Sequence, residues 1–270
     1  MDSLPQGKAD FLLFRSNNST LDIEYIINET LLSSNEYTCI SIPAVLTRAV
    51  HNLNPFSSIE ALNLKFDSKD AKDIFAKGMT FGREYELKGN YLILELEHLL
   101  EAKNDLSNIL DLGYVNEIKS SSNFDKLLNI ENKTLIFCAG FLLEASRRFH
   151  IVLSASTQTS ASLLIADKLR EDVLMRLKHN NITLTVTLTQ QLAEDKNSDI
   201  INLSSKLSYT PHIIYTTFDF KNSEISTLRE YDYNQVESSI NASAALAYGT
   251  TNGFSQAEIL NELEILIYSM

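Results

Sequence analysis

The stretch that decides the fold is residues 134–170, which read TLIFCAGFLLEASRRFHIVLSASTQTSASLLIADKLR. Two short apolar runs, 135–139 and 150–153, each end in small or polar residues and lead into helix-like sequence. This alternation predicts a β-α-β-α unit of a parallel sheet. The turn at 154–160, SASTQTS, is uncharged and follows the second run, where open α/β sheets bind ligands. Serine and threonine at a helix start are also ordinary N-caps, so a purely structural turn is the alternative interpretation.

The rest of the chain continues the alternation of strands and helices. Further strands are expected at residues 11–14, 59–66, 91–94, 182–188 and 211–217. About six short strands between helices predict an α/β fold, a mostly parallel sheet with helices on both faces. Residues 1–270 are expected to form a single domain, with any small helical part assembled from the N- and C-terminal segments. The stretch KGMTFGREYELKGN (77–90) is expected to close the helix that Ser68 caps, because Gly78 and Gly82 loosen helices.

Composition excludes several classes of partner. The net charge of −12 argues against nucleic acids and anionic membranes, although backbone N–H groups at a helix end can still hold a phosphorylated small molecule. The two cysteines, Cys39 and Cys138, lie in apolar runs and are expected to be free thiols in a reducing compartment. The N-terminus has no basic region of a signal peptide, and no apolar window reaches the length of a membrane span. We therefore expect a cytoplasmic protein.

Common catalytic and metal-binding motifs are absent from the sequence. The five histidines are scattered, and neither a Walker A sequence, Gly-x-Gly-x-x-Gly nor Gly-x-Ser-x-Gly occurs, so no metal and no cofactor are expected. Among the carboxylates, Glu237 opens a run of small residues before a helix. A partly shielded carboxylate there would serve as a general base. The structural alternative is a first-turn glutamate that complements the helix dipole.

Six segments follow one another in an order that points to a known family. They are AKDIFAKGMTFGREY (71–85), LDLGYVNEIKSSS (110–122), GFLLEASRRFHIVLSASTQTSASLLIA (140–166), LAEDKNSDIINLSSKL (192–207), FDFKNSEISTLREYD (218–232) and VESSINASAALAYGTTNGFSQAEIL (236–260). Taken together, they resemble the nicotinate-nucleotide–dimethylbenzimidazole phosphoribosyltransferase family, in particular its shorter archaeal and cyanobacterial-type branch. The similarity runs from about residue 70 to the C-terminus.

The resemblance implies a Rossmann-like enzyme, usually a homo-oligomer, with a dimer favoured. The family transfers phosphoribose from nicotinate mononucleotide to dimethylbenzimidazole, which yields nicotinate and the α-ribazole phosphate of the lower loop of cobalamin. The partners implied are therefore a small-molecule nucleotide and an aromatic base. Glu237 matches the glutamate that takes the benzimidazole proton and is the expected catalytic residue. The expected substrate-binding residues are Ser154, Ala155, Ser156, Thr157, Gln158, Glu95, Ser238, Ser239 and Asn241.

The sequence departs from the family pattern at its glycines. The family's Gly-Glu followed by Pro-Gly-Gly-Thr-Thr-Thr-Ala is replaced by LILELEHLLEAKNDL (92–106), where either Glu95 or Glu97 matches the family glutamate. The Gly-Gly of the Gly-Gly-Thr-Gln turn is Ala155-Ser156, and the glycine-rich run after Glu237 reads SSINAS. Added Cβ atoms crowd the positions where backbone N–H groups approach a phosphate. Two hypotheses stay open. The protein is either a divergent phosphoribosyltransferase, with dimethylbenzimidazole or another base as the acceptor, or a non-catalytic homologue that binds a ligand or partners an active enzyme.

Overall fold

A six-stranded parallel sheet forms the centre of the protein. The computed structural model describes residues 4–15, 42–96, 133–155, 162–167, 184–189, 207, 211–226, 228–229 and 242–269. The strands are β1 (Ala9–Arg15), β2 (Ser58–Asn63), β3 (Tyr91–Leu96), β4 (Ile151–Ser154), β5 (Leu184–Thr189) and β6 (His212–Thr216). They lie in the order β2-β1-β3-β4-β5-β6, and every neighbouring pair is parallel. The predicted α/β class with a Rossmann-like parallel sheet is confirmed.

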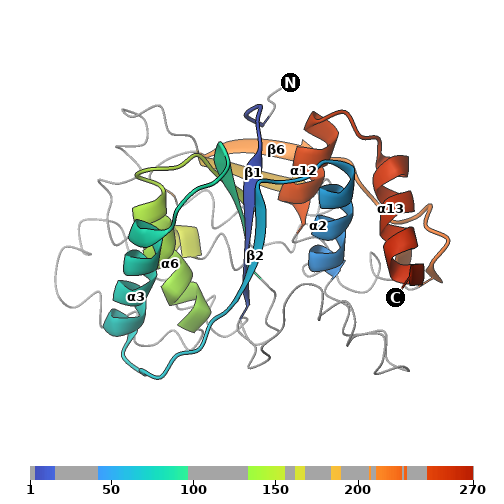
Figure 1. Ribbon diagram of the computed structural model, residues 1–270. Coiled ribbons are helices and arrows are strands. Elements are labelled where there is room, and N and C mark those ends of the chain that lie inside the picture. The colour runs from blue at the N-terminus through green and yellow to red at the C-terminus, as the bar shows by residue number, and fades with distance from the viewer. Residues whose placement is uncertain are drawn as a thin grey trace.

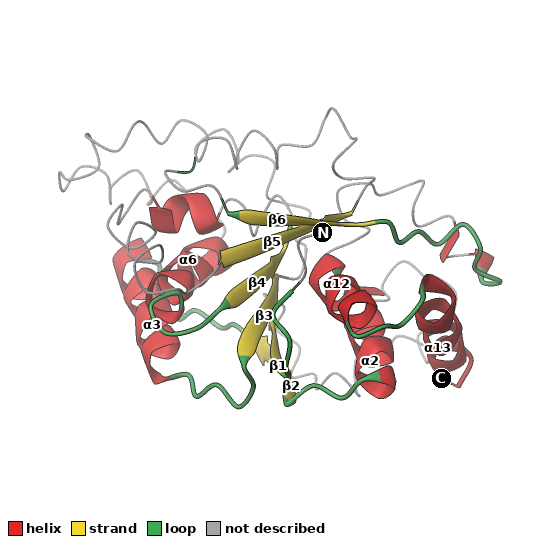
Figure 2. Ribbon diagram, turned by 90° about the horizontal axis from the view of Figure 1, so that it is seen from above, coloured by secondary structure: helices red, strands yellow, loops and turns green. Residues whose placement is uncertain are grey.

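Helices cover both faces of the sheet (Figures 1 and 2). One face carries α3 (Ala71–Glu84) and α6 (Lys133–Ala145), and the other carries α2 (Ile42–Leu53), α12 (Ser243–Thr251) and α13 (Gln256–Ser269). Side chains of β3 alternate between the faces: Leu92 and Leu94 join the apolar cluster under α3 and α6, whereas Tyr91 and Ile93 join the cluster under α2 and α12. None of the described helices combines the length and apolar character needed to cross a bilayer.

The order of the strands places a topological switch point between β1 and β3. The chain passes from β1 outward to β2 and then returns to β3 on the other side of β1. In the register of these strands, Leu13 of β1 lies between Ala61 of β2 and Glu95 of β3. Open α/β sheets bind ligands outside the carboxyl ends of the strands at such a point. Glu95 on β3 and Ser154 on the next strand, β4, are at this end of the sheet.

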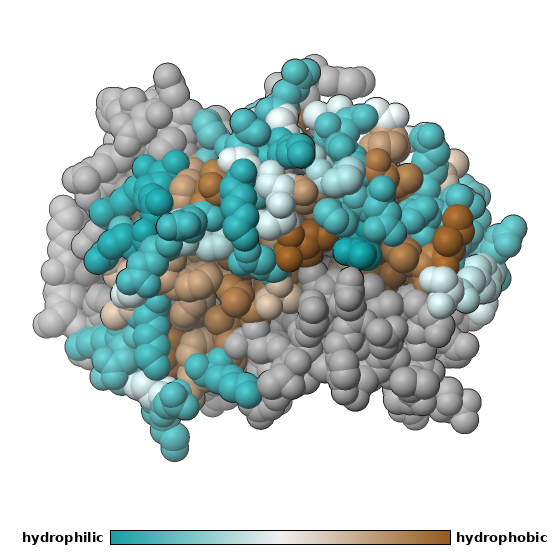
Figure 3. All heavy atoms as spheres, viewed as in Figure 1, coloured by the Kyte–Doolittle hydropathy of each residue, from teal (hydrophilic) through white to brown (hydrophobic). Residues whose placement is uncertain are grey.

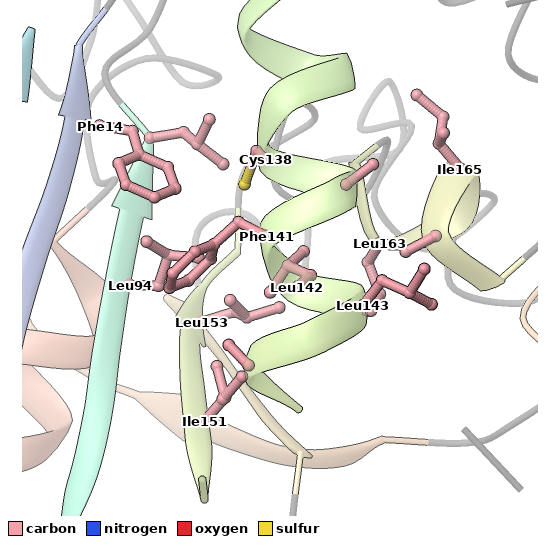
Figure 4. Packing of buried hydrophobic residues seen from close by; sticks show 14 of the residues in the cluster. Phe14, Leu94, Cys138, Phe141, Leu142, Leu143, Ile151, Leu153, Leu163 and Ile165 are labelled. Atoms are coloured by element: carbon pink, nitrogen blue, oxygen red, sulfur yellow. The ribbon is translucent and has the colours of Figure 1, made fainter. Parts of the chain in front are cut away.

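The strand predicted at residues 135–139 is wrong, because these residues form the first part of α6. The apolar sequence continues past Gly140 as far as Ala145, which exceeds the usual length of a buried strand and suits a helix. The side chains of α6 from Thr134 to Ala145 are buried on every side, so the helix shows no amphipathic pattern. In Figure 4, Cys138 and Phe141 of α6 lie among the side chains of the strands. Cys138 is a buried free thiol, as predicted.

α3 ends at Glu84, within the stretch 77–90 predicted to close it, but it runs through both Gly78 and Gly82, so these glycines do not end the helix. These glycines lie where α3 crosses α6. A Cβ atom would lie 2.0 Å from the Phe137 carbonyl oxygen at Gly78 and 2.6 Å from the Phe141 carbonyl oxygen at Gly82. The two helix backbones are therefore in direct contact, which only glycine permits.

Candidate functional site

Glu95 is a buried acid near the carboxyl end of β3. Its side chain is 0% exposed, and strand alternation places it with Tyr91 and Ile93 on the face covered by α2 and α12. Burial raises the pKa of Glu95 well above the ordinary value of 4.5 and outweighs the hydroxyls of Ser154 and Thr47, which lower it. Glu95 therefore keeps its proton at pH values where an exposed glutamate is ionised.

Ser154 connects this acid to the first turn of α12. The Ser154 hydroxyl donates to Glu95 Oε1 at 2.7 Å and accepts a hydrogen bond from the backbone N–H of Ala244 at 2.9 Å. The amide N–H of Ala244 can only donate, so this bond leaves the Ser154 proton free for the bond to Glu95 Oε1. These partners are 59 and 90 residues away from Ser154 in the sequence. We call the Ala244–Ser154–Glu95 series the polar chain.

Thr187 and Ser243 fix α12 over the ends of the strands. The Ser243 hydroxyl donates to the Thr187 carbonyl oxygen at 2.9 Å and lies 2.8 Å from Thr187 Oγ1. Thr187 Oγ1 in turn donates to the Leu153 carbonyl oxygen on β4 at 3.1 Å. Both hydroxyl side chains are fully buried. Neither residue was among the expected site residues, although Ser243 ends the SSINAS run. For Thr187 the available signal was the alternation of threonine with apolar residues in a strand that is buried on both faces.

The structure describes three of the expected site residues. Glu95 and Ser154 come together, and of the two candidate glutamates only Glu95 lies in the described part of the chain. Neither the methyl group nor the amide of Ala155 is available to a ligand, because the methyl group packs into the core under α3 and α6 and the amide donates to the Thr187 carbonyl oxygen at 2.8 Å. The residues outside the described ranges are Glu97, Ser156, Thr157, Gln158, Glu237, Ser238, Ser239 and Asn241.

A separate hollow lies on the other side of the sheet. It has a volume of about 800 Å³ and runs along α3, lined by Phe81 and Phe137 together with charged residues that include Asp67, Lys77 and Glu84. Apolar residues are also visible among hydrophilic ones below the centre of Figure 3. Because the polar chain lies on the α2 and α12 face, this hollow is not part of the same site. Within the described ranges, no three histidine, cysteine or acidic residues come together as a metal-binding group.

The raised pKa of Glu95 predicts a pH dependence of stability. Above pH 4.5 the unfolded chain releases the Glu95 proton while the folded protein retains it, so stability falls as pH rises towards the folded-state pKa. The slope is at most about 1.4 kcal/mol per pH unit. Glu95→Gln removes the titrating carboxyl. Its free energy of unfolding, measured by urea unfolding, is therefore expected to rise relative to that of the wild type between pH 4.5 and 7.

Glu258 provides a control of opposite sign. Hydrogen bonds from the Ser255 hydroxyl and amide lower the pKa of this exposed carboxyl. Its stabilising contribution is present above the ordinary glutamate pKa and is lost as pH falls through the lowered value. Glu258→Gln is therefore expected to lose stability relative to the wild type as pH rises. Parallel curves for the wild type and Glu95→Gln would show that Glu95 ionises normally in the folded protein.

Comparison with known proteins finds distant homologues whose name carries no function. No protein-family model matches the chain. A UPF0284 protein of Microcystis aeruginosa (strain NIES-843) is 23% identical over 222 residues, which cover 73% of this chain and 61% of the relative. UPF0284 proteins of Sulfolobus acidocaldarius and Gloeothece citriformis are 24% and 29% identical, over 53% and 49% of this chain. These matches cover only 39% and 35% of the two relatives' own lengths.

Proposed function

We propose that the protein is a divergent phosphoribosyltransferase that moves phosphoribose from nicotinate mononucleotide to dimethylbenzimidazole. The observation that carries this proposal is the polar chain, which joins Glu95 and Ser154 beside the switch point of the sheet. Two independent findings support it. Six segments follow the order of the family, and the distant relatives come from the archaeal and cyanobacterial sources in which the resembling branch occurs.

The proposed reaction forms one C–N bond and breaks another. Glu237 takes the N–H proton of the benzimidazole, and the nitrogen attacks C1′ of the ribose while the bond from C1′ to nicotinate breaks. The transition state has oxocarbenium character. Ser154 and Glu95 contact the substrate at the end of the sheet, and Ser156, Thr157, Gln158, Ser238, Ser239 and Asn241 contribute further contacts. The proposed active form is a homodimer.

One observation favours a second candidate function, a non-catalytic homologue that keeps the fold to bind a ligand or an active partner. The family holds its substrate with a Gly-Gly turn after the fourth strand. Here the first of those positions is Ala155, whose amide is bonded to Thr187 within the protein. The Ala155 amide is therefore not available to hold a phosphate.

The test is product formation from nicotinate mononucleotide and dimethylbenzimidazole. We expect the wild type to release α-ribazole phosphate and nicotinate, and Glu237→Gln to be slower by about 10²-fold or more because the general base is lost. Glu258→Gln, which changes an exposed glutamate on α13, is the matched control and is expected to keep the wild-type rate.

Binding measurements separate the two candidate functions. Nucleotide binding without turnover in any variant, including with a panel of other aromatic bases, would support the non-catalytic homologue. Turnover with a base other than dimethylbenzimidazole would keep the reaction and change the acceptor. Neither turnover nor binding of nucleotide would contradict the phosphoribosyltransferase proposal.

A further inference from the structure

Glu95 has one oxygen that the described protein leaves unused. Oε1 accepts the hydrogen bond from Ser154, whereas Oε2 is buried and has no hydrogen-bond partner within the described ranges. Buried polar atoms nearly always have a partner, and an exception calls for a water molecule or a ligand. Because Glu95 lies at the carboxyl end of β3 next to the switch point, Oε2 is at the place where this class of sheet binds its ligands.

The polar chain determines which carboxyl oxygen carries the proton. The Ala244 N–H donates to Ser154, and the Ser154 O–H donates to Oε1, so Oε1 is held as an acceptor. In a protonated carboxyl the proton is then on Oε2. The Thr47 hydroxyl is near enough to affect the pKa of the carboxyl, but no described atom forms a hydrogen bond with Oε2. Oε2 is therefore a donor without a bonded acceptor in the described protein, and the ligand atom it suits is an acceptor.

Among the described residues, the neighbours of Glu95 bring no ion pair to it. The described residues that face it are Leu13 on β1, Ser154 on β4 and Thr47 on α2, none of which is charged. α2 also carries Arg48 and His51, but neither is among the causes of the pKa shift of Glu95, which are burial and the hydroxyls of Ser154 and Thr47.

Two further titratable groups on the packed helices are uncharged near neutral pH. Burial chiefly, together with the charge of Arg48, lowers the pKa of His51 on α2. Burial raises the pKa of Tyr248 on α12. Neither group supplies a charge that would draw the proton from Glu95.

The first turn of α12 supplies positive potential beside this donor. α12 has nine residues, and its N-cap residue, Ala242, makes no side-chain capping bond. The first-turn amides of a helix lack partners within the helix, and the dipole makes this end favourable for anions. An ionised Glu95 would repel an anion at this position, whereas an uncharged Glu95 can donate to it.

We propose that Glu95 acts as an uncharged donor, whose Oε2–H binds an anionic oxygen of the substrate at the N-terminus of α12. The anionic oxygen belongs to a phosphate or a carboxylate, and nicotinate mononucleotide carries both. The proposal rests on the proposed function for the identity of this substrate. Glu95 is then a binding residue whose proton must stay in place, in contrast to a general base.

Nucleotide binding to Glu95 variants tests the proposal. Calorimetry would measure nicotinate mononucleotide binding to the full chain at a series of pH values from about 6 to about 9. The affinity of the wild type should fall by up to about tenfold per pH unit above the Glu95 pKa. Glu95→Gln keeps a neutral donor and should bind within a few-fold of the wild type at about pH 6, without that loss at higher pH. Glu95→Ala should bind at least about tenfold more weakly.

Several results would overturn the proposal. A loss in Glu95→Gln as large as that in Glu95→Ala would show that the charged carboxylate is needed. Equal pH profiles for Glu95→Gln and the wild type would assign the titration to another group. Separate titrations with inorganic phosphate and with nicotinate identify which anion is bound, and Glu258→Gln should match the wild type throughout.

Infrared spectroscopy separates this proposal from the proposed function. The carbonyl stretch of a protonated carboxyl should appear in the wild type without any ligand and be missing in Glu95→Gln. Absence of that band in the wild type at about pH 6 would overturn the uncharged acid whatever the enzyme does. If the band is present but nicotinate mononucleotide, phosphate and nicotinate all fail to bind, the phosphoribosyltransferase function and the anion site are both wrong, and the protonated Glu95 stands.

Discussion

Replacing Gly140 with alanine is expected to lower the free energy of unfolding by about 3 kcal/mol, the upper end of the range for overpacked cores. The new Cβ would lie 2.2 Å from the Phe75 carbonyl oxygen and 3.1 Å from the Met79 amide nitrogen. Both atoms belong to the backbone of α3, so a side-chain rotation cannot relieve the clash and the two helices must move apart. In an ordinary helix interior the same substitution stabilises by up to about 1 kcal/mol, so the sign of the change is itself informative.

Urea unfolding measures this effect, and Gly249→Ala on α12 is the matched control. At Gly249 the nearest atoms to a Cβ would be side-chain methyl groups, those of Ile259 at 3.1 Å and Val50 at 3.2 Å. These groups can shift by a few tenths of an ångström, and we expect a change within about 1 kcal/mol. Equal losses in both variants, or a gain of stability in Gly140→Ala, would contradict the direct backbone contact between α3 and α6.

The strands could be predicted because their pattern is local. The expected segments at 91–94, 182–188 and 211–217 correspond to β3, β5 and β6, since β-branched and apolar residues mark strands whatever lies next to them. α6 was not predicted because residues 135–139 look like a buried strand, and only the whole apolar length distinguishes a helix from a strand here. The role of Gly78 depends on a second helix 59 residues further on, and no local pattern reveals that contact.

The site could be predicted only in part. Alternation within β3 puts Glu95 on the same face as Tyr91 and Ile93, so its side of the sheet follows from the sequence once the strand is known. Its bond to Ser154 depends on the parallel register of β3 and β4, in which Leu94 lies beside Leu153. Strand register cannot be read from either strand alone.

The hydrogen bond that joins α12 to the site could not be predicted from the sequence. A serine-rich helix start was expected, but the contact that joins α12 to the sheet uses the backbone amide of Ala244, a group that every residue possesses. Catalytic side chains can be recognised in a sequence. Backbone N–H groups at a helix end can be recognised as donors to a site only when the position of the helix is known.

The polar chain is unusual for the interior of a parallel sheet. A buried carboxyl without an ion pair destabilises the fold relative to an apolar residue of the same size. Here the destabilisation is limited because Glu95 is uncharged and Oε1 is bonded to Ser154. The other oxygen, Oε2, is buried without a hydrogen bond and therefore does not stabilise the fold. Buried groups that break the rules of folding in this way are concentrated at functional sites.

Ser154→Ala is expected to destabilise the protein by about 3 kcal/mol, although it removes a single oxygen atom. The substitution leaves both the Ala244 N–H and Glu95 Oε1 without their partner in a buried position. Each unsatisfied buried group costs about 1–3 kcal/mol. Ser162→Ala is the control. This buried serine donates to the Leu135 carbonyl oxygen at 3.2 Å, and its other polar neighbour is the Cys138 thiol, which forms only weak hydrogen bonds, so its loss should cost about 1 kcal/mol.

A double-mutant cycle tests whether the loss arises in the polar chain. Glu95→Leu removes the acceptor, so the added effect of Ser154→Ala in that background comes only from the Ala244 amide. We expect the double variant to be more stable than the sum of the two single changes predicts, by about 1–2 kcal/mol, as for groups that share a hydrogen bond. Additive effects would mean that the serine hydroxyl and the acid act independently. In that case the proton on Glu95 is not directed by Ser154, and the donor role of Oε2 loses its geometric basis.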